Sequence, residues 1–448
     1  MDLIATAHNG RTGISAGRLS EDDCNRNFCE MHVPLERNAA RVEAERCYFC
    51  FDAPCAEACP TGIDIPGFIR MIANGNAPGA AGLILKENIL GGTCARACPV
   101  ETLCEGVCVR NHGDDRPVNI GLLQRYAVDQ ALDSNTKFFT RASSTGKTVG
   151  IVGAGPAGLA CAHQLAVLGH HAVIYEARPK SGGLNEYGLA AYKMLGGFAQ
   201  REVDLILSLG GIEVQHDTIL GEDLSLEDLQ NRHDAVFLGI GLGGGHALGI
   251  PGEDGAGVVD AVSFIDRLRQ AEQLSSVPVG RKVIVIGGGM TAIDAAVQAR
   301  LLGAEDVTIV YRRGAESMKA SILEQEFAKI RGISIRYWAK PEKIVLKDGA
   351  VTGVAFSTTD PSSGDHPYVL EADMVMKAIG QSPHLDRANP GQGFKCEGDR
   401  LVVDEHRQTS CPGIWAGGDC IAGGDDLTVS AVQDGKVAAN AIHRALTA

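Results

Sequence analysis

Eight of the 14 cysteines lie between Cys47 and Cys108, in two runs with the spacing of metal ligands. The runs are Cys47-x2-Cys50-x4-Cys55-x3-Cys59-Pro60 and Cys94-x3-Cys98-Pro99-x5-Cys104-x3-Cys108. Closely spaced thiolates can surround one cluster of iron and sulfide, and a Cys-Pro ending is typical of bacterial ferredoxins. Spacing alone groups the four cysteines of the second run around one cluster.

Zinc is the main alternative for these cysteines, because Cys-x2-Cys is also the spacing of a zinc knuckle. Zinc usually takes four ligands in two close pairs, so eight cysteines with two Cys-Pro endings fit two iron–sulfur clusters better. Free or disulfide-linked thiols are a further alternative. The remaining cysteines are interpreted as buried or inert thiols: Cys24, Cys29, Cys161, Cys396, Cys411 and Cys420.

A glycine loop with a phosphate-binding pattern follows the apolar segment 148–152. It reads Gly153-Ala154-Gly155-Pro156-Ala157-Gly158. The glycines permit a tight turn, close approach of the backbone to a pyrophosphate and close packing of the next helix, whose N-terminus faces the phosphates. Glu176 ends the next predicted strand and can accept hydrogen bonds from ribose hydroxyls. The pattern predicts a dinucleotide site, with a purely structural glycine turn as the alternative.

A second loop of this kind reads Gly287-Gly288-Gly289-Met290-Thr291-Ala292 and follows Val283–Ile286. The next predicted strand, Val307–Tyr311, is followed by Arg312 and Arg313 rather than by an acid. Guanidinium groups at this position favour the 2′-phosphate of NADPH, although NADH stays possible. The alternative is that the two arginines are solvated surface charges.

A third motif lies near the C-terminus, where 413–419 ends in Gly418 and Asp419 before a helix predicted from Thr428. An acid beside glycines at the end of a strand can bind the ribityl chain or the pyrophosphate edge of FAD. The positive end of the following helix can face the isoalloxazine ring. Together with the first loop, this motif predicts FAD.

These residues need two βαβ units to position them, one for each glycine loop. Helical patterns at Ile65–Ala73, Gly79–Asn88 and 119–133 accompany the cysteines, and 136–147 resembles a linker. The segments 401–403 and 413–416 and a helix over 428–446 return to the first βαβ unit. The sequence therefore predicts an α/β protein with two Rossmann-like domains after an α-helical cysteine-rich domain.

Length and charge limit the function. A chain of 448 residues suggests about three domains. A formal net charge of −14 argues against nucleic acid as a partner. No apolar stretch is long enough to span a bilayer. The polar, mixed N-terminus resembles no export signal, so we expect a cytoplasmic protein.

The combined order of motifs resembles the family that includes the small subunit of glutamate synthase and the electron-input half of dihydropyrimidine dehydrogenase. The resemblance covers nearly the whole chain after about residue 40. It implies a helical domain with two 4Fe-4S clusters at 1–145 and an FAD domain in two parts, 146–270 and 386–448. An NAD(P)H domain at 271–385 would be inserted between those parts.

The resemblance also implies a ligand set. One cluster would be held by Cys47, Cys50, Cys55 and Cys108, and the other by Cys59, Cys98, Cys104 and Gln124. The stretch 119–124 matches the one that carries a Gln ligand in dihydropyrimidine dehydrogenases, where glutamate synthase small subunits typically have Glu. Cys94 would then not be a ligand. The remaining expected cofactor contacts are Gly183, Leu184, Lys193, Thr428 and Val429 for FAD, and Met290, Thr291, Lys319 and Gly380 for NADPH.

In function, the resemblance implies an electron-input subunit of dihydropyrimidine dehydrogenase. No FMN-binding barrel or C-terminal ferredoxin domain is recognised, so we expect a separate FMN- and iron–sulfur-containing catalytic subunit. We expect no catalytic acid or base, because hydride transfer needs proximity and stacking. The alternatives are a glutamate synthase small subunit, an input subunit for another acceptor such as ferredoxin, a redox sensor and a zinc-stabilised interaction module.

Overall fold

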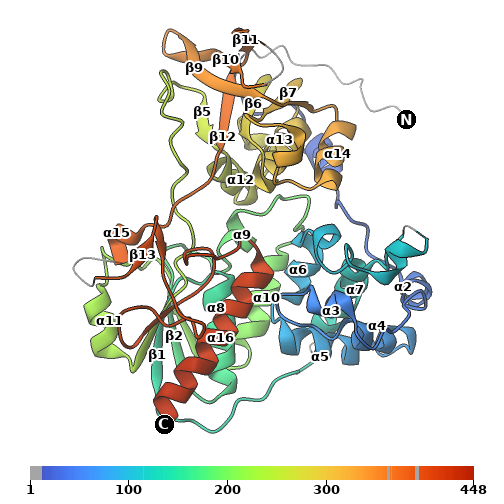
Figure 1. Cartoon of the computed structure of the whole chain (residues 1–448), viewed down its shortest axis with the longest axis vertical. Coiled ribbons are helices and arrows are strands. Elements are labelled where there is room, and N and C mark those ends of the chain that lie inside the picture. Colours follow the sequence, from blue (N-terminus) through green and yellow to red (C-terminus); the bar gives the residue numbers. More distant parts are fainter. Residues whose placement is uncertain (1–12, 115, 135, 361–363, 365, 389–392) are drawn as a thin grey trace. The chain divides into compact units, whose positions relative to one another are not determined.

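A computed structural model describes residues 13–114, 116–134, 136–360, 364, 366–388 and 393–448, which fold into two compact units (Figure 1). The smaller unit contains residues 13–31, Tyr187–Tyr192 and Gly245–Gln381. The larger unit contains His32–Glu186, Lys193–Gly244 and Ser382–Ala448. Most of the smaller unit, Gly245–Gln381, is thus inserted between segments of the larger one along the chain, whereas residues 13–31 precede it.

The larger unit begins with short helices, and six of the eight clustered cysteines lie in the segments between them. The helices are α2 (Arg37–Ala44), α3 (Pro54–Glu57), α4 (Ile65–Ala73), α5 (Ala77–Glu87), α6 (Gly91–Ala97), the 3-10 turns η1 (Val100–Thr102) and η2 (Val109–His112), and α7 (Ile120–Asp133). Asp64 and Asn76 cap α4 and α5 by accepting backbone N–H bonds, and a proline follows in each first turn. Buried Ile, Ala, Leu and Phe side chains of α4, α5 and α7 form one core.

The larger unit continues into a parallel five-stranded sheet in the order β15-β4-β1-β2-β3. The strands are β1 (Thr148–Val152), β2 (His171–Tyr175), β3 (Ile212–Gln215), β4 (Ala235–Leu238) and β15 (Ile414–Ala416). The other elements are α8 (Pro156–Val167), α9 (Leu184–Tyr187), α10 (Phe198–Leu207), α11 (Leu226–Arg232), α15 (Leu385–Ala388), the hairpin β13 (Cys396–Glu397) and β14 (Arg400–Leu401), and α16 (Thr428–Thr447). The central strands are buried almost throughout, as expected for a parallel sheet with helices on its faces.

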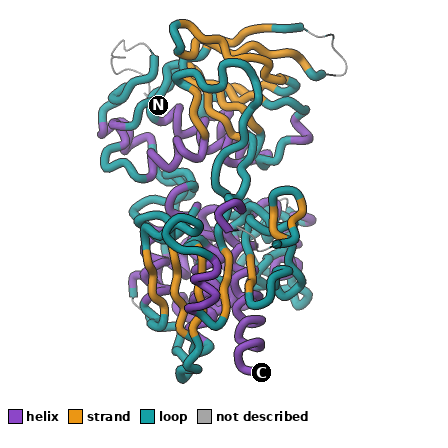
Figure 2. The backbone as a smooth tube through the Cα atoms, turned by 90° about the vertical axis from the view of Figure 1, so that its left-hand side faces the viewer, coloured by secondary structure: helices purple, strands orange, loops and turns teal. Residues whose placement is uncertain are grey.

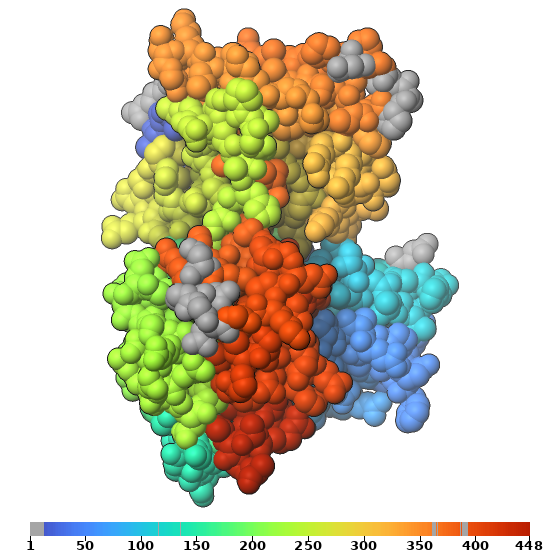
Figure 3. Space-filling view, turned by 60° about the vertical axis from the view of Figure 1, so that its left-hand side comes forward, coloured from blue at the N-terminus to red at the C-terminus, as the bar shows by residue number. Residues whose placement is uncertain are grey.

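The C-terminal helix α16 joins the two parts of the larger unit. It packs along α8 beside the sheet and also contacts α6 of the helical part. Lys436 on α16 bonds the Glu87 carboxylate at 2.9 Å, at the end of α5. The same neighbourhood is visible on the molecular surface, where the red C-terminal segment borders the blue helical part (Figure 3).

The smaller unit contains a second parallel sheet in the order β5-β12-β6-β7-β8. Figure 2 shows the strands of the chain in orange. Its strands are β5 (Val258–Asp260), β6 (Lys282–Gly287), β7 (Asp306–Val310), β8 (Ser334–Arg336) and β12 (Met374–Ala378). An antiparallel sheet is formed by β9 (Ala339–Lys347), β10 (Ala350–Thr358) and β11 (Tyr368–Glu371). The helices are α1 (Glu21–Asn27), α12 (Ala261–Arg269), α13 (Met290–Leu301) and α14 (Ile322–Ile330), with 3-10 turns η3 (Leu274–Ser276) and η4 (Ala315–Ser317).

The first described residues belong to this smaller unit, although the expected helical domain at 1–145 includes them. The Glu21 carboxylate accepts hydrogen bonds from the backbone N–H groups of Leu274 and Ser275, at 3.2 and 2.8 Å. Phe28 and Cys24 are buried in the core of the second sheet. Side-chain burial and these bonds therefore hold residues 13–31 on the smaller unit.

The two parallel sheets confirm the α/β prediction and the two Rossmann-like domains. Among the described residues, no helix has both the length and the apolar character needed to cross a bilayer.

Candidate functional site

The first glycine loop connects β1 to α8 with the backbone geometry that the pattern predicts. Gly153 has φ +94°, in the region that favours glycine. A Cβ on Gly158 would lie 2.0 Å from the Gly153 carbonyl oxygen, so the third glycine is needed for the helix to approach the strand. Gly183 closes on the same loop, since its Cβ would lie 2.7 Å from the Cα of Gly155. These residues form a cradle in which a pyrophosphate could contact backbone N–H groups.

Glu176 stands at the end of β2, next to this loop. Its carboxylate accepts hydrogen bonds from the backbone N–H of Ala154 at 2.7 Å and of Arg178 at 2.9 Å. The side chain is only 7% exposed, and burial raises the pKa of this carboxyl group. The two bonds fix the carboxylate at the edge of the cradle, where lone pairs are left for ribose hydroxyls.

The C-terminal motif reaches the same cradle from β15. A Cβ on Gly418 would meet Ala157 of the first loop at 3.3 Å. The Gly418 N–H donates to the Asp434 carboxylate at 2.8 Å, and Arg407 binds that carboxylate at 2.7 Å. Burial, and then the neighbouring Asp426, raise the pKa of Asp419 to about 6.

The start of α16 completes this group. The Thr428 hydroxyl donates to the side-chain oxygen of Asn185 at 2.8 Å, and Val429 is buried beside it. Lys193 is buried, whereas Leu184 is 38% exposed. The larger unit therefore brings together the first loop, Glu176 and the C-terminal motif, as FAD would require.

The second glycine loop lies between β6 and α13 of the smaller unit. A Cβ on Gly287 would meet the Ala378 carbonyl oxygen at 2.1 Å, and one on Gly288 would meet the Tyr311 ring at 2.5 Å. Gly289 has open space in front of it, and Met290 and Thr291 begin α13. The Gly288 carbonyl accepts the Ala320 N–H at 3.0 Å, which holds the neighbouring Lys319 near the loop.

Arg312 and Arg313 follow β7 on this side of the sheet, and both side chains are exposed. Within the described part of the chain, neither guanidinium group forms an ion pair. Gly380, just after β12, has φ +105° and lies two residues from the Ala378 contact of the loop. The smaller unit thus has a glycine loop after β6 and two exposed cations after the neighbouring strand β7.

Two cavities in the helical part divide the clustered cysteines. The first has an empty volume of about 390 Å³, open solvent included, and contains the four thiols that the family resemblance groups together. They are Cys47, Cys50, Cys55 and Cys108. The rest of its lining is mostly apolar, from Ile65, Ile69 and Val118 among others. Cys108 lies here and not with the other cysteines of its run, which differs from the grouping by spacing.

The second cavity has a similar volume and is lined by Cys59, Cys94, Cys98, Cys104 and Gln124. The Gln124 side-chain nitrogen donates to the Gly91 carbonyl at 2.6 Å, so the side-chain oxygen is left for another partner. Cys94 accepts a hydrogen bond from the Asn88 amide at 3.1 Å, which gives this thiol a partner within the protein. Val429 of α16 also lines this cavity, next to the predicted FAD contact Thr428.

The donors around both cavities fit iron–sulfur clusters. In a cluster each thiolate binds its own iron, so the four donors surround a volume. In a zinc site the donors converge on one atom, with Zn–S distances near 2.3 Å. Among the described residues, no three Cys, His, Asp or Glu side chains converge on a point in this way. Burial raises the pKa of Cys55 to about 11, and a metal ligand must be deprotonated, so binding of a cation by this thiol would release its proton.

Several residues that organise these sites were not among the predicted ones. Asn185 and Asp434 hold the FAD-side loops, and Asn88 binds Cys94. Glu202 on α10 is fully buried against α6. In sequence, an acid on a helix resembles a solvated surface residue, so no signal in the sequence distinguishes Asp434 or Glu202.

Two family models match different parts of the chain. Residues 147–435 match the family model described as pyridine nucleotide-disulphide oxidoreductase. Residues 24–136 match the model of dihydropyrimidine dehydrogenase domain II with a 4Fe-4S cluster. FAD and NAD(P) binding and a 4Fe-4S domain are thereby supported.

Three similar curated proteins are subunits or chains of different oxidoreductases. The chain is 36% identical over 405 residues to the NAD-dependent dihydropyrimidine dehydrogenase subunit PreT of Salmonella typhimurium, covering 90% of this chain and 94% of that protein. It is 33% identical over 442 residues to the glutamate synthase [NADPH] small chain of Escherichia coli, covering 93% of each. It is 36% identical over 351 residues to the NADPH-Fe(3+) oxidoreductase subunit beta of Geobacter sulfurreducens, covering 75% of this chain and 52% of that one.

Among solved structures, the thioredoxin reductase of T. acidophilum superposes with a TM-score of 0.56 at 22% identity. The match covers 67% of this chain and all of that one, which shows a shared fold of the two dinucleotide domains. The chain belongs to the pyridine nucleotide-disulphide oxidoreductase family, in the group with PreT and the glutamate synthase small chain, and it is an NAD(P)H-dependent flavin and iron–sulfur oxidoreductase.

Proposed function

We propose that this chain is the electron-input subunit of a dihydropyrimidine dehydrogenase. The acceptor would be an FMN- and iron–sulfur-containing partner subunit that interconverts uracil or thymine and the 5,6-dihydropyrimidines. When bound, FAD would accept a hydride from NAD(P)H, and two 4Fe-4S clusters would pass single electrons to the partner. The observation that carries this proposal is the second cavity, where Gln124 lies with Cys59, Cys98 and Cys104, while the fourth thiol, Cys94, accepts a hydrogen bond from Asn88.

The residues of the larger unit would bind and orient the flavin. The first glycine loop would hold the pyrophosphate of FAD. Glu176 would bind the ribose of its adenosine, and Asp419 would bind its ribityl chain. Val429 lines the second cavity one residue after Thr428. The proposed flavin site and the second cavity are therefore neighbours in the fold, as a short electron path requires.

In the smaller unit, the second loop would hold NAD(P)H, with Arg312 and Arg313 as candidates for the 2′-phosphate. We propose NADPH on this ground, with NADH possible. Lys319 lies by the same loop and would add a third positive charge.

A glutamate synthase small subunit is the second candidate, because the coverage of that relative is equally complete. The fourth donor of the second cavity separates the two candidates. An amide such as Gln124 matches the dihydropyrimidine dehydrogenase pattern, and a carboxylate would match the glutamate synthase pattern.

The test is an anaerobic affinity purification of the tagged chain from its native cell, with the partner identified by mass spectrometry. We expect an FMN-binding subunit with ferredoxin-like cysteines, and uracil-dependent oxidation of NADPH by the isolated complex. A glutamine-hydrolysing large subunit in its place would contradict the proposal and assign the chain to glutamate synthesis. The Gln124→Glu variant is the matched control, because it replaces the amide of the dihydropyrimidine dehydrogenase pattern by the carboxylate of the glutamate synthase pattern.

A further inference from the structure

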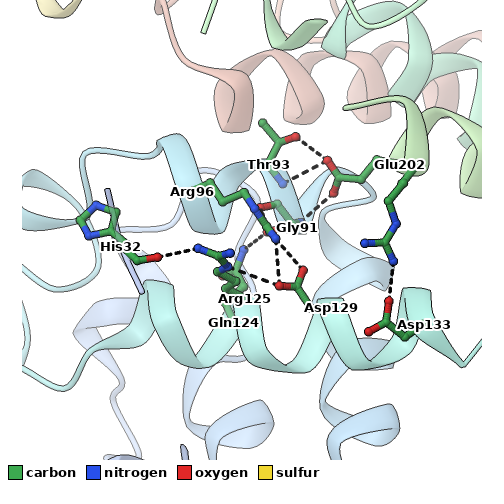
Figure 4. Close-up of polar contacts among 11 residues, drawn as sticks. His32, Gly91, Thr93, Arg96, Gln124, Arg125, Asp129, Asp133 and Glu202 are labelled. Atoms are coloured by element: carbon green, nitrogen blue, oxygen red, sulfur yellow. Dashed lines mark hydrogen bonds and ion pairs between the residues drawn. The ribbon is translucent and has the colours of Figure 1, made fainter. Parts of the chain in front are cut away.

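A buried carboxylate links α10, which packs beside the five-stranded sheet of the larger unit, to α6, which forms one wall of the second cavity. Glu202 belongs to α10 and is 0% exposed (Figure 4). Its carboxylate accepts the backbone N–H of Gly92 at 2.8 Å and of Thr93 at 3.0 Å, and also the Thr93 hydroxyl. These are donors of the first turn of α6, whose own N-cap residue, Leu90, supplies no side-chain acceptor.

The contact is close because the facing residue is glycine. A Cβ on Gly92 would lie 2.5 Å from the Phe198 ring and 2.9 Å from the Glu202 carboxylate. Arg96, one turn further along α6, places its guanidinium carbon 3.5 Å from the centroid of the same Phe198 ring. The guanidinium group also binds both oxygens of Asp129 on α7, each at 2.8 Å. Helix α6 is therefore held between α10 and α7.

The segment that Glu202 holds also orients Gln124. Gly91 precedes the capped residues, and its carbonyl accepts the Gln124 side-chain N–H at 2.6 Å. A shift of α6 would move that carbonyl and rotate the amide whose oxygen is the proposed iron ligand. Cys98, a further proposed ligand, follows the last residue of α6. Two of the four donors of the second cavity thus depend on the position of α6.

We propose that Glu202 is a positioning residue for the cluster of the second cavity, acting through α6 and the Gly91 carbonyl on Gln124. This inference rests on the proposed function, because it assumes a cluster with Gln124 as a ligand. It predicts that a substitution of Glu202 on α10 alters the cluster of the second cavity and leaves the cluster of the first cavity unchanged. The first cavity contacts none of the residues in this chain of bonds.

The test compares the intact protein with Glu202→Gln and Glu202→Ala, all purified without air. The Gln variant keeps one acceptor oxygen and the volume of the side chain, whereas the Ala variant leaves the donors of α6 unpaired. We expect full iron but an altered electron paramagnetic resonance signal and midpoint potential for one cluster in Glu202→Gln. We expect a loss of up to half of the iron in Glu202→Ala. Flavin content and the rate of flavin reduction by NADPH should stay within about twofold of wild type, since no predicted flavin contact lies on α10.

The matched control is Asp133→Asn. Asp133 on α7 pairs with Arg201 on α10 at 2.6 Å, so it is also a carboxylate contact between α10 and the helical part, but it reaches α7 rather than α6 and both side chains are exposed. We expect this variant to resemble wild type in both cluster signals. If Glu202→Ala fails to fold, Thr93→Val removes one donor to the carboxylate and should shift the same cluster signal by a smaller amount.

Unchanged signals and potentials for both clusters in Glu202→Gln and Thr93→Val would overturn the inference, and so would equal shifts of both clusters. A wild-type protein with only one cluster, or with zinc, would instead overturn the proposed function. The two failures are therefore distinguishable in one set of samples.

Discussion

Replacement of Glu176 should weaken the binding of FAD by an amount that the structure allows to be worked out. The carboxylate accepts a buried backbone N–H bond from Ala154 and a part-buried one from Arg178. In Glu176→Ala both N–H groups lose their acceptor, and a buried unsatisfied group costs about 1–3 kcal/mol. The loss at Ala154 should therefore destabilise the first loop by about 1–3 kcal/mol, before any bond to the cofactor is counted.

The flavin itself should lose further bonds in this variant. A hydrogen bond to a charged group contributes about 1.5–3 kcal/mol. Each ribose bond lost from Glu176 should therefore weaken FAD binding by about 10- to 100-fold. Glu176→Gln keeps one acceptor oxygen and should be affected less than Glu176→Ala.

The assay is a titration of flavin-free protein with FAD, followed by flavin fluorescence, beside circular dichroism as a check of folding. Glu213→Gln is the matched control, because Glu213 lies on the neighbouring strand β3 with an exposed side chain. A folded Glu176→Ala variant that binds FAD within about twofold of wild type would refute the assignment of the carboxylate to the ribose.

Four further predictions follow from other residues. Replacing Arg312 and Arg313 by Gln should lower kcat/KM for NADPH at least about tenfold with little change for NADH, since the loss of one 2′-phosphate contact of about 1.4 kcal/mol corresponds to that factor. An unchanged ratio of kcat/KM for NADPH to kcat/KM for NADH would mean that the arginines do not bind the phosphate. Gln124→Ala should remove or alter one cluster, so that iron falls from about eight toward about four per chain; intact iron and spectra would exclude Gln124 as a ligand. Asp434→Asn should weaken FAD binding by disturbing Gly418, without changing the Kd of NADPH measured on the same sample. Burial raises the pKa of Glu202 from 4.5 to about 7. The folded state therefore holds an extra proton between these pH values, and the stability of the protein should fall as pH rises through this range. The apparent Tm of wild type, measured anaerobically against pH, should show this fall, whereas curves of Tm against pH that run parallel for wild type and Glu202→Gln would contradict it.

The parts of the site that depend on local backbone geometry could be predicted from the sequence. A glycine loop needs a strand before it and a helix after it, and apolar runs beside Gly153 and Gly287 indicate both. Glu176 could be found in the same way, because the end of the next parallel strand lies beside the loop. The expected helix at 119–133 agrees closely with α7.

The parts that depend on contacts between distant segments could not be predicted from local patterns. Spacing groups Cys108 with Cys104, yet the fold turns between them and Cys108 faces the first cavity. The pairing of residues 13–31 with the smaller unit rests on Glu21 bonds to a segment more than 250 positions away. Glu202 and Phe198 pack closely against α6 because Gly92 has no Cβ, which would clash with both side chains.

We propose that NAD(P)H electrons pass through FAD to two 4Fe-4S clusters in this chain. The most direct measurement is the iron, sulfide, zinc and flavin content of protein purified without air, followed by electron paramagnetic resonance after reduction with NADPH. We expect about eight irons and eight sulfides with one flavin per chain, and two distinct cluster signals after reduction. Zinc in place of iron, about four irons, or a reduced flavin without any cluster signal would contradict it.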